Sequence, residues 1–134
     1  LQGICPDGWH IPTDDEWILL EGVTDTEFYP GHYDFHRSNM WRGYDVGKQL
    51  KSSQGWFTRT NGENRSGFTA LPGGMRSENG DFVTHEYDGY FWTSNSTKYE
   101  SGAMRKLSYN YDGSWRSSLK KSCGLYVRCV KNEE

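Results

Sequence analysis

The chain has 134 residues and a formal net charge of −3, which is the length of one ordinary domain, so we expect residues 1–134 to form a single domain. No stretch approaches the roughly 18 uninterrupted apolar residues that a membrane-spanning helix needs, which excludes a span within this sequence. The negative net charge and the lack of a helix or ribbon dense in Lys and Arg argue against nucleic acid as a partner.

A capping box predicts the first helix. Thr13 stands three residues before Glu16, and the acidic residues between them place negative charge where the helix dipole is positive. The helix is expected over residues 14–23. Its inward face would hold Trp17, Leu20 and either Val23 or Thr24.

The segment 24–44 is aromatic, polar and aperiodic, which predicts a long loop. It holds His32 and His36 with Asp34 between them, but Pro and Gly precede the pair and no helical period surrounds it, so no metal site is expected here. A second, short helix is expected near residues 44–51, with Val46 and Leu50 one turn apart.

After Gly55 the pattern changes to short apolar runs separated by Gly and Asn, which is typical of strands and turns. Strands are expected at residues 68–70, 81–85, 90–94, 103–110, 114–119 and 125–130, with a hairpin turn at 111–113. In the last strand Leu125, Val127 and Cys129 alternate with their neighbours, so Cys129 would face the core. The predicted class is α+β, with two early helices followed by a twisted antiparallel sheet with long loops.

Three cysteines indicate the compartment. Neither Cys5 nor Cys129 belongs to a closely spaced pair of the kind that forms a zinc ribbon or a redox site. A disulfide between them is expected; it would hold the two ends of the chain together, stabilise the fold by about 4 to 5 kcal/mol and persist only in an oxidising compartment. Cys123 stays open: it could be a buried thiol, compete for Cys5 or join two molecules.

Charge and polarity single out the late part of the chain. Residues 98–131 hold eight Lys or Arg against two acids, a net charge of +6, which could attract an anionic partner or could only balance charge within the fold. The segment 93–122 is rich in Ser, Tyr and Asn, as is typical of antibody paratopes, although an ordinary polar sheet face has a similar composition. The candidate ligand-binding residues are Asn95, Tyr99, Tyr109, Asn110, Tyr111, Trp115 and Arg116.

Four segments occur in an order that carries a family resemblance. They are Cys5-Pro-Asp-Gly-Trp-His-Ile-Pro-Thr-Asp-Asp-Glu-Trp17, Gly67-Phe-Thr-Ala-Leu-Pro-Gly-Gly-Met-Arg76, Gly89-Tyr-Phe-Trp-Thr-Ser94 and Gly124-Leu-Tyr-Val-Arg-Cys-Val-Lys131. Together they resemble the Fibrobacter succinogenes major paralogous domain, a family of secreted and surface proteins that looks like an offshoot of the C-type lectin fold. The sequence departs from the family at Cys123, where an aromatic residue is usual, and in a longer segment 24–44.

The resemblance implies a C-type lectin-like fold with adjacent N- and C-termini, an extracellular or bacterial cell-surface setting and a ligand face on the late strands and loops. It also places Trp9, Trp17, Trp56 and Trp92 in the core. The function expected from it is that of a non-catalytic binding module of a surface or secreted protein, monomeric as a domain, whose partner is a glycan or a surface protein. No catalytic residue, metal ligand or cofactor is assigned.

Three alternatives stay open. The domain could be a structural spacer in a lipoprotein, or an oxidase of the formylglycine-generating type, although the close cysteine pair that holds copper in those enzymes is missing. Calcium could bind, as in many C-type lectins, but the candidate oxygen donors are scattered along the chain. These donors are Asp88, Asn95, Glu100 and Asp112.

Overall fold

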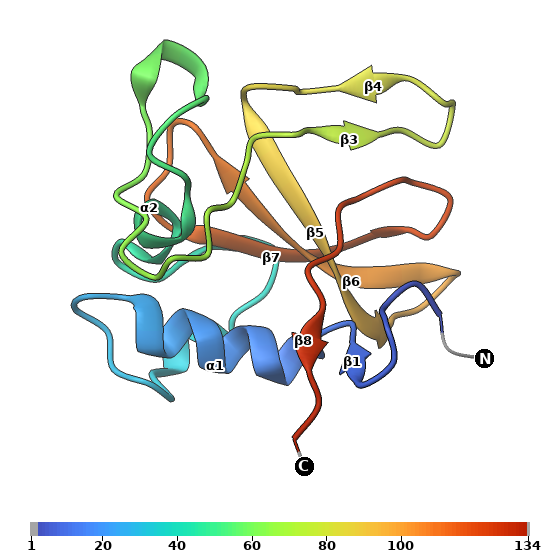
Figure 1. Cartoon of the computed structure of the whole chain (residues 1–134), viewed down its shortest axis with the longest axis horizontal. Helices are drawn as coiled ribbons and strands as arrows, with labels where there is room; N and C mark the ends of the chain where they lie inside the picture. Colours follow the sequence, from blue (N-terminus) through green and yellow to red (C-terminus); the bar gives the residue numbers. More distant parts are fainter. Residues whose placement is uncertain (1–2, 134) are drawn as a thin grey trace.

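The computed structural model describes residues 3–133, so positions 1, 2 and 134 of the expected domain lie outside the described residues. Within residues 3–133, two α-helices and two 3-10 turns surround a four-stranded antiparallel sheet, which confirms the predicted α+β class (Figure 1). None of the helices in this described part has the length and apolar character to cross a membrane.

Helix α1 (Asp14–Thr24) begins as its sequence predicts. The Thr13 hydroxyl accepts a hydrogen bond from the Glu16 backbone nitrogen, and the Glu16 carboxylate accepts one from the Thr13 nitrogen, which completes the capping box. Trp17 is buried and Thr24 is buried, whereas Val23 is 61% exposed, so the inward face includes Thr24 and not Val23.

Helix α2 (Val46–Leu50) is shorter than the expected 44–51, and both Val46 and Leu50 are fully buried as their spacing indicates. It packs against α1 and leads to the 3-10 turn η2 (Phe57–Arg59). The backbone nitrogens of Gly47 and Lys48 both donate to the carbonyl oxygen of Asp112, so the start of α2 is held by the turn between two late strands.

The sheet has the strand order β2–β7–β6–β5, with β2 at Met40–Arg42, β7 at Ser114–Lys120, β6 at Ser101–Ser108 and β5 at Asp88–Ser96. The three longer strands confirm the sequence expectations to within three residues at each end, and the hairpin at 111–113 joins β6 to β7. Helix α1 crosses one face of this sheet (Figure 1). The core between them contains Trp17, Ile18, Phe35, Val46, Leu50, Trp56, Ala70, Phe91 and Leu107.

Cross-strand register places two rows of side chains on opposite faces of the sheet. In one row Phe91 pairs with Arg105 and Arg105 pairs with Arg116, and these side chains face α1. In the next row Tyr90, Lys106, Trp115 and Trp41 come from β5, β6, β7 and β2 in turn. The second row therefore lies on the face of the sheet that points away from α1.

The two ends of the chain lie side by side. Strand β1 (Trp9–His10) pairs antiparallel with β8 (Val130–Lys131), beside it in Figure 1. Cys5 forms a disulfide with Cys129 across a sequence separation of 124 residues. Both the predicted disulfide and the predicted proximity of the ends are confirmed.

Five sequence expectations need correction. The segment 24–44 is not only loop, because it contains the 3-10 turn η1 (Tyr33–His36) and strand β2. The expected strand 68–70 is a single bridge from Ala70 to Lys51, since the chain there bonds the end of α2 and no neighbouring strand. The expected strand 81–85 contributes only β4 (Phe82–Val83), in a small hairpin with β3 (Met75–Arg76).

The fourth correction concerns the end of the chain. Only Val130 of the expected strand 125–130 joins a named strand, because Tyr126 bonds to Tyr90 and Trp92 and the ladder does not continue. The predicted alternation holds from Gly124 to Cys129, where half-buried Leu125, Val127 and Cys129 alternate with exposed residues, but Val130 is half-buried as well. The fifth correction concerns two tryptophans that were expected in the core. Trp9 is 41% exposed, since it belongs to the peripheral β1–β8 pair, and Trp92 is half-buried outside the core cluster.

Candidate functional site

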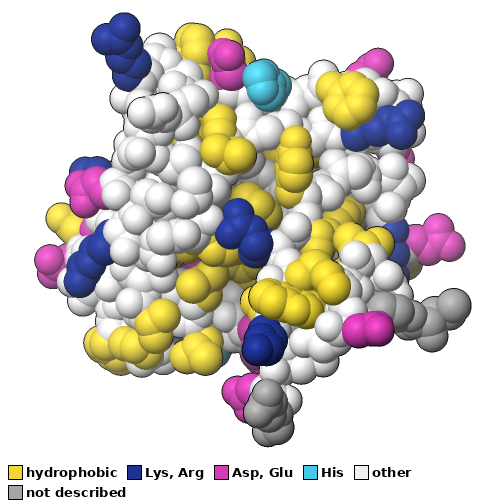
Figure 2. Space-filling view, viewed as in Figure 1, with side chains coloured by type: hydrophobic (Ala, Val, Ile, Leu, Met, Phe, Trp, Pro, Cys, Tyr) yellow, Lys and Arg dark blue, Asp and Glu magenta, His cyan; other side chains and the backbone are white. Residues whose placement is uncertain are grey.

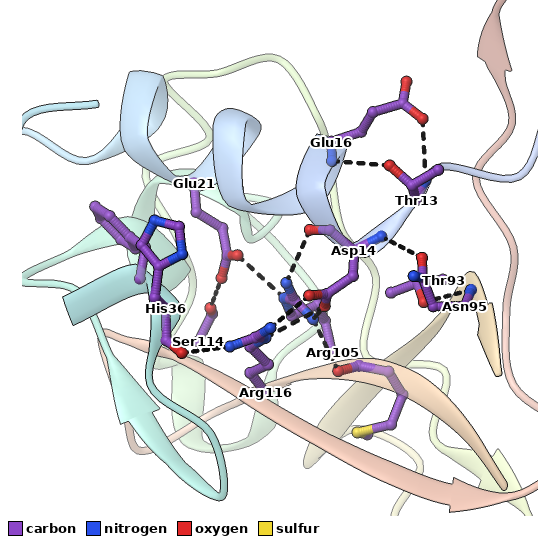
Figure 3. A network of polar contacts seen from close by, with 12 residues as sticks. Thr13, Asp14, Glu16, Glu21, His36, Thr93, Asn95, Arg105, Ser114 and Arg116 are labelled. Atoms are coloured by element: carbon purple, nitrogen blue, oxygen red, sulfur yellow. Dashed lines mark hydrogen bonds and ion pairs between the residues drawn. The ribbon is translucent and has the colours of Figure 1, made fainter. Parts of the chain in front are cut away.

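A buried ion network ties α1 to the sheet. The carboxylate of Glu21 accepts hydrogen bonds from Arg42 of β2 at 2.6 and 2.9 Å and from Arg105 of β6 at 3.0 Å, and all three side chains are fully buried. The Ser114 hydroxyl also donates to Glu21. Buried charges are tolerated when they are paired and hydrogen-bonded in this way, and the network fixes the angle of α1 on the sheet (Figure 3).

The network continues to the first residue of α1. Asp14 accepts a hydrogen bond from Arg105 Nη1 at 2.7 Å and from Arg116 Nη2 at 2.6 Å, so one carboxylate joins β6 and β7 to the helix. Arg116 also donates to the carbonyl oxygen of His36 in η1. Figure 3 shows Asp14 pointing from the helix start toward both guanidinium groups.

These arginines set the ionisation of the two carboxylates. Burial opposes ionisation most strongly at both sites, but the hydrogen bonds and charge of Arg116 and Arg105 outweigh it and lower the pKa of Asp14. Arg105 and Arg42 likewise lower the pKa of Glu21, again against a large effect of burial. Both groups are therefore charged at neutral pH.

Asn95 reaches the same helix start from the end of β5. The pairing of β5 with β6 shifts register between Trp92 and Ser96, and such an irregularity redirects the side chains it contains. The Thr93 hydroxyl accepts from the Asn95 nitrogen, and Oδ1 of Asn95 accepts from the Asp14 nitrogen at 2.8 Å. One end of the Asn95 amide is thus held by a backbone N–H of the helix.

The residues around Asp14 enclose a polar cleft of about 300 Å³. Asp14, Asn95 and Arg116 line it, and every other lining side chain except Ala103 is a hydroxyl or amide. These others include Asn39, Thr97 and Ser118. We call this site the polar cleft.

A second group of side chains lies on the opposite face of the sheet. The Trp41 ring stacks on Tyr111 with centroids 4.3 Å apart and meets Trp115 edge to face at 5.5 Å. Lys106 Nζ lies 5.4 Å from the Trp41 centroid, 5.3 Å from that of Trp115 and 5.9 Å from that of Tyr90. We call these residues the aromatic row; a small cleft of about 160 Å³ opens beside Lys106 and Trp115.

A larger groove of about 620 Å³ runs along the segment that leads to β8 and is mostly apolar, with Leu71, Pro72 and Tyr126 in its walls. Figure 2 looks onto the side of the molecule that carries β8 and shows hydrophobic side chains gathered across its centre. None of the seven residues that the sequence suggested as ligand contacts lines this groove.

The structure divides those seven residues among different places. Asn95 and Arg116 both line the polar cleft, whereas Tyr111 and Trp115 each pack against Trp41 on the opposite face. Tyr99 is 92% exposed at the tip of the β5–β6 turn.

The remaining two lie at the other end of β6. Tyr109 is half-buried and packs its ring against Phe57 and Tyr87, and Asn110 bonds Ser108. Neither lines the polar cleft or the small cleft by Lys106, so the seven residues do not form one continuous platform.

Sequence reasoning missed Asp14, Asn39 and Trp41 as site residues. Asp14 has a ready explanation as a helix-start acid, which hides its second role, and Trp41 lies in a segment without periodicity. Lys106 could have been assigned to the face of the sheet that points away from α1. It alternates with buried Arg105 and Leu107, so its side chain lies on the same face as that of Met104.

The histidines and the scattered oxygen donors do not converge. His32 stacks on Phe28 and Tyr33, and its Nδ1 accepts a hydrogen bond from the Asp34 nitrogen. No group of three or more His, Cys, Asp or Glu side chains within residues 3–133 is arranged to hold a metal ion. Cys123 is half-buried and is the one free thiol in that range.

Fold and site together define an α+β domain closed by a disulfide, with a polar cleft where α1 meets the sheet. The chain belongs to the family of the Fibrobacter succinogenes major domain, whose model matches residues 1–131 and so confirms the resemblance seen in the four motifs. Neither the curated proteins nor the solved structures include a significant match.

Proposed function

We propose that this chain is a non-catalytic extracellular binding module that holds carbohydrate in the polar cleft. The observation that carries the proposal is the lining of that cleft, where Asp14, Asn95 and Arg116 converge among hydroxyl and amide side chains. Sugar hydroxyls donate and accept hydrogen bonds at once, and a set of carboxylate, amide and guanidinium groups offers partners for both roles. A volume of about 300 Å³ is at the lower end of the range for ligand pockets.

Two side chains in the polar cleft can still donate hydrogen bonds to a ligand. Among the described residues, no protein group bonds the Asn95 amide nitrogen, although Oδ1 of the same side chain is anchored to the helix start. Arg116 Nη2 donates to Asp14 and has a second hydrogen to give. Because hydrogen bonds to Asp14 hold both side chains in place, little side-chain entropy would be lost on binding.

The extracellular setting rests on the disulfide between Cys5 and Cys129, a bond that persists in oxidising compartments. The family resemblance supports the same setting and a C-type lectin-like character of the fold. Binding without catalysis is favoured over the oxidase alternative because Cys129 is engaged in the disulfide, which leaves Cys123 without a partner thiol to hold copper.

The test is a glycan array on the intact chain, followed by calorimetric titration of the best ligand. Asn95→Asp keeps an oxygen acceptor for the Asp14 N–H but removes the amide donor, so it is expected to weaken binding about fivefold or more without unfolding the protein. Tyr99→Ala, which changes an exposed ring outside the cleft, is the matched control and should leave affinity unchanged.

Two results would overturn the proposal. Unaltered affinity in Asn95→Asp would remove the polar cleft as the site. Absence of binding to every glycan, together with capture of a protein partner, would leave the binding module but replace its ligand class.

A further inference from the structure

The polar cleft and the small cleft beside the aromatic row meet at the outer edge of β7. Ser117 and Ser118 line both clefts, although the two clefts open toward opposite faces of the sheet. The neighbouring strand β2 ends its pairing at Arg116, so no named strand of the described residues covers β7 beyond that position. A ligand that leaves the polar cleft can therefore cross this edge and reach Lys106 and Trp115.

The surface along this path offers contacts suited to a sugar chain. Ser117 and Ser118 supply hydroxyls at the edge, and Trp115 supplies a half-buried ring on the far side. Flat aromatic surface next to hydrogen-bonding groups binds amphipathic rings, whose faces carry C–H groups and whose rims carry hydroxyls. The small cleft adds about 160 Å³, so the combined path exceeds what one sugar ring would fill.

Positive charge borders the path at both ends. Arg116 lines the polar cleft, Lys121 donates to Ser96 at its rim, and Lys106 lines the small cleft. Among the acids, Asp14 is paired with two arginines, and Glu78 is paired with Lys120.

The β5–β6 turn also carries an acid. Glu100 is at the tip of the β5–β6 turn, where Lys98 of the same turn offsets its charge. Three charged side chains line the two clefts, Asp14, Arg116 and Lys106, and Lys121 lies at the rim, so the path has an excess of positive charge, and a surface of this sign concentrates anionic ligands.

We propose that the ligand is a linear acidic polysaccharide that occupies the polar cleft, crosses the edge of β7 at Ser117 and Ser118, and places a further acidic sugar beside Lys106 and Trp115. This inference rests on the proposed carbohydrate binding and specifies the length and charge of the ligand. The acidic group is a carboxylate or a sulfate, both of which pair with Lys and Arg.

The experiment measures the affinity of the intact chain for oligosaccharides of increasing length. The probes are oligogalacturonates and heparin fragments, which separate carboxylate from sulfate, with neutral xylo-oligosaccharides as the uncharged series and single-stranded DNA as a polyanion that is not a sugar. Affinity for one acidic series is expected to rise about tenfold or more from disaccharide to hexasaccharide, because the second contact becomes intramolecular. Added salt should weaken it.

Substitutions at the two points of contact test the path. Ser118→Glu and Ser118→Gln add the same bulk, so a loss of about fivefold in Ser118→Glu relative to Ser118→Gln isolates charge repulsion at the edge. Ser53→Glu adds the same charge at an exposed position that lines neither cleft and should have no effect.

Lys106→Gln should abolish the gain in affinity with length, and melting curves check that each variant is folded. Equal affinity for disaccharide and hexasaccharide, a preference for the neutral series or for DNA, or equal behaviour of the two Ser118 variants would overturn this inference. If the chain binds neutral glycans and Asn95→Asp weakens that binding, this inference is overturned while the proposed function stays intact. If the chain binds no glycan, both are overturned.

Discussion

Glu21 of α1 and Arg42 of β2 form an ion pair, with Arg42 Nη1 2.6 Å from Glu21 Oε2, in which both side chains are completely shielded from solvent. Arg105 contributes a second guanidinium to the same carboxylate. The pair stands between the helix and the sheet, so the position of Asp14, seven residues earlier on α1, depends on it. Stability and the geometry of the polar cleft are thereby coupled through one carboxylate.

Removal of that carboxylate's charge should be strongly destabilising. Glu21→Gln keeps the shape but leaves the buried Arg42 without its counter-charge and Arg105 with only the Asp14 carboxylate that it shares with Arg116. Breaking a buried pair typically costs about 3–5 kcal/mol. The measurement is urea unfolding followed by tryptophan fluorescence. Glu27→Gln, at an exposed position just after the helix, is the control and should lie within about 0.5 kcal/mol of the unaltered chain. A similar small change in Glu21→Gln would show that the network contributes little.

Acid should unfold the protein through the same network. The pKa of Asp14 and that of Glu21 are both lowered in the folded state, so the folded state binds fewer protons than the unfolded state in this range. The stability they contribute is complete above the ordinary carboxyl pKa of about 4 and is lost as the pH falls below it.

Unfolding free energies measured between pH 7 and pH 2.5 check this expectation. In Glu21→Gln one of the two titrating groups is absent, so its stability should fall less steeply with acid, and the two curves should approach each other at low pH. Parallel curves over the whole range would contradict the assignment of acid sensitivity to Glu21.

The local elements could be read from the sequence because local chemistry defines them. The capping box at Thr13 and Glu16 fixes where α1 begins, and turn residues at 111–113 fix the β6–β7 hairpin. Strand β2 could not be predicted in this way, since three residues show no period and Met40–Arg42 becomes a strand only by pairing with β7. Its position is set by contacts distant in sequence.

The buried charges were also unexpected, although the sequence contained a signal for them. Glu21 lies one helical turn after Trp17 and so falls on the inward face of α1, and Arg105 lies between Ala103 and Leu107 on the inward face of β6. Charged residues are usually assigned to the surface, so a lone one on an apolar face is easily overlooked. An acid and a base at such positions on two elements predict a buried ion pair.

The disulfide should be the main stabiliser of the joined ends. Replacing both Cys5 and Cys129 by Ser is expected to lower the free energy of unfolding by about 4 to 5 kcal/mol, because the bond closes a loop of more than a hundred residues. Cys123→Ser is the control and should change it by less than about 0.5 kcal/mol. Mass spectrometry of the unreduced chain should find one free thiol, at position 123; a free thiol at position 5 would refute the pairing.

Gly47 tests how α2 is seated against the β6–β7 turn. Alanine normally stabilises the interior of a helix relative to glycine by about 0.8–1.0 kcal/mol, so propensity alone predicts that Gly47→Ala strengthens α2. A Cβ at this position would instead lie 2.0 Å from the carbonyl oxygen of Gly113, and the next nearest atoms are also backbone atoms of Asp112 and Gly113, so no flexible side chain can move aside. We expect Gly47→Ala to lower the melting temperature.

Lys48→Ala, one residue further along and partly exposed, keeps the same backbone contact with Asp112 and should melt close to the unaltered chain. A rise in the melting temperature of Gly47→Ala would mean that α2 does not pack this closely against the turn.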